Sequence, residues 1–234
     1  MKDLIKGMSK IEYLKKYNSG IQLLAFDTLS EEQLKEMPEF WKEAISQVEV
    51  TKRVTSILEN WSKFLYQFQS TISYLKVNLL DVELVIDNDQ LALLYTIKNL
   101  KGAEVYYIGF NPNTKTTIDY FEKLPDSFKD IYNNLHNGWV YYASKSNGLL
   151  PIEDTIILGN EEWGILEEID ASTLPFKLDN CIGLFDNGKG DYASIDLQSE
   201  NEKIGFIWWH TKMPKLNIEI WPVIDEWTRI GIER

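Results

Sequence analysis

A regular spacing of large apolar residues between positions 54 and 75 restricts the fold of this chain more than any other feature of the sequence. After Thr51, these residues recur mostly at intervals of three and four, which is the period of an α-helix. They are Val54, Ile57, Leu58, Trp61, Leu65, Phe68, Ile72 and Leu75. The stripe predicts one long helix whose apolar side lies in the core. A shorter helix is expected from Ser30, because Ser30 and Gln33 fit a capping box.

Segments rich in strand formers follow this helix. "VELVI", "LALLYTI" and "AEVYYIGF" are β-branched and aromatic, and the polar turn "DNDQ" separates the first two. They predict antiparallel strands. The loop "NPNTKTT", at 111–117, is the expected boundary between two parts. Residues 1–117 would form an α/β N-terminal region, either as a separate domain or as part of the same one, and residues 118–234 would form an α+β domain.

The second half begins with a helix and continues with short strands. "LPDSFKDIYNNLHNGW" predicts a helix capped by Asp126 or Ser127 and ended by Gly138, with His136 near its last carbonyls. A short helix is expected at 161–169 and a closing helix in "VIDEWTRIGIE". The expected strands are "WVYYA", "TIIL", "CIGLF", "YASIDL", "IGFIWWH" and "NIEIW". The fold class is therefore α+β, with a mixed, largely antiparallel sheet flanked by helices.

Charge limits the classes of partner. The net charge is -12, which argues against the basic surface that nucleic-acid binding needs. Up to Thr117 the chain has 14 basic and 15 acidic residues, whereas beyond Thr117 it has 10 basic and 21 acidic residues. No basic residue lies between Lys145 and Lys177, but seven acidic ones do: Glu153, Asp154, Glu161, Glu162, Glu167, Glu168 and Asp170. These carboxylates form either a solvated face or a docking surface for a basic protein.

The stretch "GLFDNGKG", at 183–190, has the spacing of a phosphate-binding loop but lacks its other parts. Gly190 follows Lys189 where a hydroxyl would hold magnesium, and Asp186 would place a carboxylate in the anion site. The alternation in "DYASIDL" predicts a strand where a phosphate loop needs a helix. We therefore expect a hairpin loop whose asparagine and glycines permit positive φ angles.

Other reactive motifs are weak. Calcium-loop spacing from Asp186 through Asp191 and Asp196 fails, because glycines occupy the third and fifth positions. Two distant histidines, His136 and His210, give little support for a metal site. Cys181 is expected to be a core residue. The sequence predicts no catalytic residues, no cofactor and no metal, and an enzyme is only a third hypothesis, a hydrolase using Lys189 or His210.

Two adjacent tryptophans are candidates for a binding anchor. Trp208 and Trp209 occupy neighbouring positions of an expected strand, so their side chains should point to opposite faces of the sheet. One of them is therefore either an exposed anchor for a partner or covered by helices from the first half. With Asp186 and Asp191 of the hairpin, these tryptophans complete the expected contact residues.

The order of several motifs resembles the SUKH superfamily, which includes bacterial toxin-immunity proteins and fungal cell-wall synthesis regulators. The opening "LPDSFKDIYNNLHNGW" is similar to that family's signature, through Leu124, Pro125, Phe128, Tyr132, Asn137 and Gly138. "GLLPIEDTIIL", "GDYASIDL", "IGFIWWH" and a closing helix with Trp227 follow in the family's order, over roughly 118–234. The resemblance implies a mixed α+β fold around a curved sheet and no cofactor.

For bacterial members, the resemblance implies binding and neutralisation of a toxin domain, often a nuclease. An acidic immunity protein suits a cognate toxin that is basic where it holds nucleic acid. The alternative is a cytoplasmic regulator or scaffold that binds endogenous partners. No apolar run reaches the eighteen or so residues that cross a bilayer, so we expect a cytoplasmic protein with no membrane partner.

Overall fold

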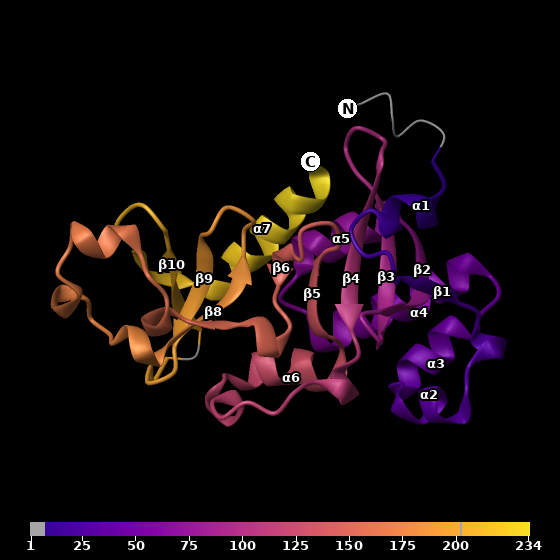
Figure 1. Ribbon diagram of the computed structural model, residues 1–234, viewed down its shortest axis with the longest axis horizontal. Helices are drawn as coiled ribbons and strands as arrows, with labels where there is room; N and C mark the ends of the chain where they lie inside the picture. The colour runs from indigo at the N-terminus through magenta and orange to yellow at the C-terminus, as the bar shows by residue number, and fades with distance from the viewer. Residues whose placement is uncertain (1–7, 202) are drawn as a thin grey trace.

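The computed structural model describes residues 8–201 and 203–234, and its main feature is an antiparallel sheet of eleven strands (Figure 1). The strand order is β1-β2-β3-β4-β5-β6-β8-β9-β10-β11, and the short strand β7, which is outside this order, pairs with β8. The strands are β1 (Gln22–Leu24), β2 (Leu79–Asp87), β3 (Gln90–Lys98), β4 (Glu104–Phe110), β5 (Asn137–Tyr141), β6 (Ser146–Leu149), β7 (Ile156–Ile157), β8 (Cys181–Asp186), β9 (Tyr192–Asp196), β10 (Ile204–Trp208) and β11 (Lys215–Glu219). The expected α+β fold with an antiparallel sheet flanked by helices is confirmed.

Both faces of the sheet are covered. The described residues contain seven α-helices, α1 (Lys10–Lys15), α2 (Glu31–Glu36), α3 (Glu39–Ile45), α4 (Val50–Phe64), α5 (Gln69–Asn78), α6 (Asp126–Asn134) and α7 (Ile220–Glu233). Helices α3 to α7 contribute to the large core on one face. On the opposite face, Leu14 of α1 packs over β2 to β5, and the segment between β7 and β8 packs over β8 to β10. No helix among the described residues is long and apolar enough to cross a bilayer.

Strands β2, β3 and β4 form a meander, as their sequences predict. The β2–β3 turn consists of Asn88 and Asp89, whose φ angles are 50° and 63°, between the paired residues Asp87 and Gln90. Two positive φ angles match the right-handed twist of the strands, and asparagine and aspartate tolerate them better than most residues. The turn therefore fixes the register that places Leu84, Leu93 and their neighbours in the core.

Strands on either side of the predicted boundary loop belong to the same sheet. This loop joins β4 to β5, and those strands pair directly, with Ile108 opposite Val140. Asn111 Nδ2, at the start of the loop, also donates to the main-chain oxygen of Glu36 at 3.0 Å. One sheet thus includes strands from both 1–117 and 118–234.

The apolar stripe at 54–75 forms two helices, so the expectation of one long helix is wrong. Helix α4 ends at Phe64 and α5 begins at Gln69. Asp225 of α7 stabilises the break, because its carboxylate accepts from the main-chain nitrogens of Ser70 and Thr71, both at 2.8 Å. These nitrogens belong to the first turn of α5, which lacks acceptors within the helix. The capping residue lies 154 positions away from Thr71, so no local pattern could indicate it.

Helix α6 exists where the sequence predicts it, but its caps differ. Neither Asp126 nor Ser127 caps it, since the N-cap is Pro125 and no side chain bonds the first turn there. Ser127 Oγ instead accepts from the indole of Trp221 at 3.1 Å. The helix ends at Asn134, and Gly138, with φ 78°, lies in β5, where a Cβ would lie 2.3 Å from Pro151 N.

Several shorter elements also differ from expectation. "TIIL" contributes only β7, and the helix expected at 161–169 is a single 3-10 turn, Gly164–Glu167. The final residues of "NIEIW", Ile220 and Trp221, already belong to α7. Strands β1 and β6 carried no strand signal, because β1 has three residues and β6 contains Asn147 at φ 52° and Gly148.

His136 lies in the core rather than at exposed helix carbonyls, which corrects its expected role. Its Nε2 lies 2.7 Å from the hydroxyl of Tyr95, which accepts from the indole of Trp61 at 3.0 Å. This arrangement suits donation from the Tyr95 hydroxyl to Nε2, with the ring proton on Nδ1. Burial lowers the pKa of His136 to about 3, and the nearby Phe110 backbone, which acts to raise the pKa, offsets only part of this effect. Nδ1 has no hydrogen-bond partner of regular geometry. The imidazole is thus neutral at physiological pH.

Candidate partner-binding surface

The segment between β7 and β8 presents most of the acidic residues that the sequence singles out. We call residues 158–179 the acidic loop. It contains four 3-10 turns: Leu158–Asn160, Gly164–Glu167, Ala171–Thr173 and the start of Leu178–Asn180. Leu158, Ile165 and Leu174 are buried in a cluster with Cys181, Phe206 and Trp208 of the sheet. These apolar anchors fix the loop against the face of the sheet opposite α7.

Aromatic contacts hold the acidic loop at both of its ends. Trp163 Nε1 donates to the main-chain oxygen of Leu158 at 2.8 Å, and its ring meets Trp208 edge-on at 5.6 Å. Phe176 stacks on Phe206 with 4.3 Å between the ring centroids. The loop is therefore a packed layer on the sheet. Its exposed side chains are presented from fixed positions, which lowers the entropy that binding would cost.

The outer side of the acidic loop is lined with exposed carboxylates. Glu161, Glu162, Glu167, Glu168, Asp170 and Asp179 are all exposed. None of them forms an ion pair with any residue in the described ranges. Asp170 Oδ1 accepts from Ser172 N at 2.9 Å, and this hydrogen bond lowers its pKa. Asp179 escaped notice in the sequence because it follows Lys177, where the interval without basic residues ends.

A groove with an apolar floor runs along the same loop. Its volume is about 690 Å³. It is lined by Gly159, Ala171, Ser172, Leu174, Pro175, Phe176, Lys177, Leu178 and Asp179. An apolar centre beside a charged rim is the usual composition of a protein–protein contact.

Glu153 and Asp154 lie outside the acidic loop, in the 3-10 turn Ile152–Asp154. Glu153 Oε2 accepts from Asn137 Nδ2 at 2.8 Å, and Asn137 Oδ1 accepts from Ile152 N at 2.8 Å. Glu153 therefore helps to hold this turn against β5, although it remains exposed. Asp154 is exposed beside it.

Asp191 is buried and bonded within the fold, so it cannot act as a contact residue in this conformation. Its Oδ1 lies 2.7 Å from Nδ1 of His210 and accepts from His210 N at 3.2 Å, while its Oδ2 accepts from Asn187 Nδ2 at 2.9 Å. Burial alone would raise the pKa of Asp191, but the hydrogen bonds from Asn187 and His210 bring it below the ordinary value. Asp191 thus fixes the hairpin to the end of β10.

The hairpin expected for "GLFDNGKG" is confirmed. Strands β8 and β9 flank it, and Gly188 and Gly190 have φ angles of 75° and 83°. Asp186 Oδ1 accepts from Gly188 N at 2.6 Å and Asn187 Oδ1 from Lys189 N at 2.9 Å, so loop side chains already satisfy these amides. Partial burial raises the pKa of Asp186.

Tyr192, the first residue of β9, lies between the hairpin and the acidic loop. Burial is the main cause that raises the pKa of its phenol, and the nearby charges of Asp186 and Glu161 raise this pKa further. The ring of Trp163 also lies 6.0 Å from that of Tyr192, so the acidic loop is next to the strand that follows the hairpin.

The two tryptophans point to opposite faces, as expected, and both faces are covered. Trp208 is 0% exposed beneath the acidic loop, so it cannot be a surface anchor and is removed from the contact residues. Trp209 lies on the α7 side, 6.0 Å from the ring of Trp227, with Lys212 Nζ 4.0 Å above its own ring. Of the two, Trp209 alone is partly exposed.

The candidate reactive residues Cys181, His136 and His210 contact different neighbours. The described residues contain no group of three or more His, Cys, Asp and Glu side chains arranged to hold a metal ion. Cys181 is buried as expected, and burial raises the pKa of its thiol to about 12. His210 and Asp191 form an acid–base pair, but no hydroxyl or thiol of the described residues bonds to His210.

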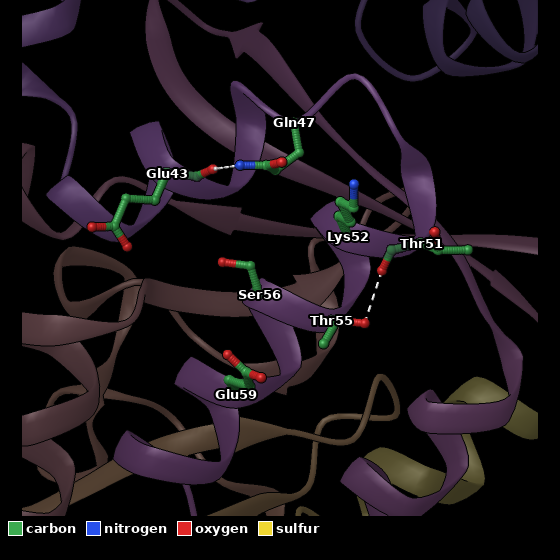
Figure 2. A pocket seen from close by; sticks show the side chains of 7 residues that line it. All are labelled: Glu43, Gln47, Thr51, Lys52, Thr55, Ser56 and Glu59. Atoms are coloured by element: carbon green, nitrogen blue, oxygen red, sulfur yellow. Dashed lines mark hydrogen bonds between the residues drawn. The ribbon is translucent and has the colours of Figure 1, made fainter.

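A second groove lies between α3 and α4, in the first half of the sequence (Figure 2). It measures about 520 Å³ and is lined by Glu43, Gln47, Thr51, Lys52, Thr55, Ser56 and Glu59. Thr55 Oγ1 donates to Thr51 O at 2.8 Å and Gln47 Nε2 donates to Glu43 O at 3.2 Å. These side chains therefore bond main-chain oxygens near the start of α4 and the end of α3. The groove is polar and open, and no apolar anchor lies in it. The acidic loop is the better candidate for a contact with another protein.

Comparison of the chain with protein-family models, with curated proteins and with solved structures found no match. The resemblance to the SUKH superfamily therefore rests on the order of the quoted motifs, and membership of that family stays a prediction.

Proposed function

We propose that this chain is a non-enzymatic immunity protein that acts in the cytoplasm by binding and neutralising a cognate basic toxin, a nuclease in the first instance. The acidic loop carries this proposal, because it combines exposed, unpaired carboxylates with a packed apolar base. Its carboxylates would attract the basic surface with which a nuclease holds nucleic acid. The groove over Leu174 and Phe176 would take an apolar side chain of the partner.

The charge distribution supports the same assignment. The 22 residues of the acidic loop include six unpaired carboxylates and one basic residue, Lys177. A solvated face would need no fixed backbone, whereas Trp163 and Phe176 hold this one against the sheet. A preformed charged surface speeds the encounter with an oppositely charged partner.

The proposal is tested by co-expressing the chain with the product of the neighbouring gene and measuring growth. The wild-type chain should form a complex with that product and restore growth. Replacing Glu161, Glu162 and Glu167 by lysine should abolish the rescue. Equal reversals at three exposed, unpaired residues of the first half, Glu36, Glu43 and Glu59, should preserve it. Rescue by both variants would remove the acidic loop from the mechanism, and no complex at all would refute immunity.

A further inference from the structure

A small cavity on the α7 side of the sheet gathers positive charge in an otherwise acidic protein. Its volume is about 120 Å³, which is large enough for several waters and so for a group of phosphate size. Trp227, Ile230, Gly231 and Arg234 line it from one side of α7, at helical spacing. Asn147 of β6 and Asn187 and Lys189 of the β8–β9 hairpin complete the wall.

The two cations of this cavity have no carboxylate partners among residues 8–201 and 203–234. Lys189 and Arg234 form no ion pair there. Glu233, which directly precedes Arg234 in the sequence, is paired with Arg229. Asp191, on the hairpin, is bonded to His210 and Asn187. Neither Lys189 nor Arg234 is therefore neutralised by an ion pair to a side-chain carboxylate of the described residues.

The floor of the cavity depends on a glycine. A Cβ at Gly231 would lie 2.8 Å from the hydroxyl of Tyr107 and 3.6 Å from Cβ of Asn147. The Tyr107 hydroxyl is buried and has no hydrogen-bond partner. A polar group thus lies directly beneath Gly231, where a larger residue would fill the space between helix and sheet. The amide of Asn147 adds a neutral donor to the two cations.

We propose that this cavity binds a phosphate-sized dianion, held by the side chains of Lys189 and Arg234 and by the amide of Asn147. Two cations match the two negative charges of a phosphate group, and Trp227 and Ile230 form an apolar wall beside it. The site differs from a phosphate-binding loop, because Asp186 and Asn187 already bond the amides of Gly188 and Lys189. The lysine of the "GLFDNGKG" stretch acts here through its side chain alone.

The test is a titration of the full chain with sodium phosphate at constant ionic strength, followed by backbone-amide chemical shifts. Saturable shifts should appear at Asn147, Lys189 and Gly231, and not with chloride. Lys189→Gln and Arg234→Gln should each weaken binding by about five- to tenfold. Lys35→Gln, which removes an equal charge on exposed α2, should leave the affinity unchanged.

Each outcome decides the proposal. Unsaturable or absent shifts, or shifts elsewhere on the surface, would overturn it. Equal binding of acetate would replace the dianion by a carboxylate group and overturn the charge match. Equal weakening by Lys35→Gln would reduce the effect to net charge. Because the cavity and the acidic loop lie on opposite faces of the sheet, failure here leaves the proposed toxin binding untouched.

Discussion

Acidification from pH 7 to pH 5 should destabilise this protein through His136. The unfolded imidazole has a pKa of about 6.5, whereas burial lowers the pKa of His136 to about 3 in the folded chain. The unfolded state therefore binds more protons between these values, so the free energy of unfolding falls as the pH falls. The contribution of neutral His136 is present above pH 6.5 and is lost progressively toward pH 3.

The expected loss from this residue is about 2 kcal/mol between pH 7 and pH 5, because one pKa unit corresponds to about 1.4 kcal/mol. Asp191 titrates below this range, because its pKa is lowered, and carboxylates with a raised pKa, such as Asp186, contribute equally to wild type and to His136→Gln. The chain has only two histidines, so His210 is the natural control. Urea unfolding, followed by tryptophan fluorescence, measures the free energy at both pH values.

His136→Gln should remove this part of the pH dependence, while His210→Gln should keep it. The ring resonances of His136 in the folded wild-type chain should also remain those of a neutral imidazole at pH 5. An identical loss of stability in wild type and His136→Gln, or a ring that titrates near pH 6.5, would refute the reasoning.

Three further predictions concern stability and reactivity. Asp225→Ala should lower the free energy of unfolding by about 2–3 kcal/mol, because it leaves one buried and one partly buried amide of α5 without their acceptor; urea titration measures this, and a loss under 0.5 kcal/mol would contradict it. Gly109→Ala should destabilise the fold, since its Cβ would lie 2.6 Å from the His136 ring; an unchanged melting temperature would contradict this. Cys181 should resist a disulfide reagent in the native chain and react after denaturation; fast native labelling would contradict its burial.

Local patterns predicted the elements whose cause is local. The β2–β3 hairpin follows from the turn residues Asn88 and Asp89, and α2 begins at the capping box of Ser30 and Gln33. The hairpin around Gly188 and Gly190 also followed from its residues, which need positive φ angles. In each case, the residues that determine the conformation lie within a few positions of it.

The failures have distant causes. Asp225 interrupts the stripe at 54–75 from the C-terminal helix, and Tyr95 draws His136 into the core from the β3 strand. Alternation left open which of Trp208 and Trp209 is buried, because the layer that covers Trp208 is an irregular loop without a periodic signal. The acidic residues of that loop were identified from charge alone, but its apolar anchors and groove became visible only with the fold.

The central claim, that the acidic loop recruits a basic partner, is tested most directly by association kinetics with the neighbouring gene product at several salt concentrations. At low salt, reversing Glu161, Glu162 and Glu167 should slow association by about tenfold or more and flatten its dependence on ionic strength. The matched variant at Glu36, Glu43 and Glu59 should associate nearly as fast as wild type. Equal association rates for the two variants, or a wild-type rate independent of salt, would contradict the account.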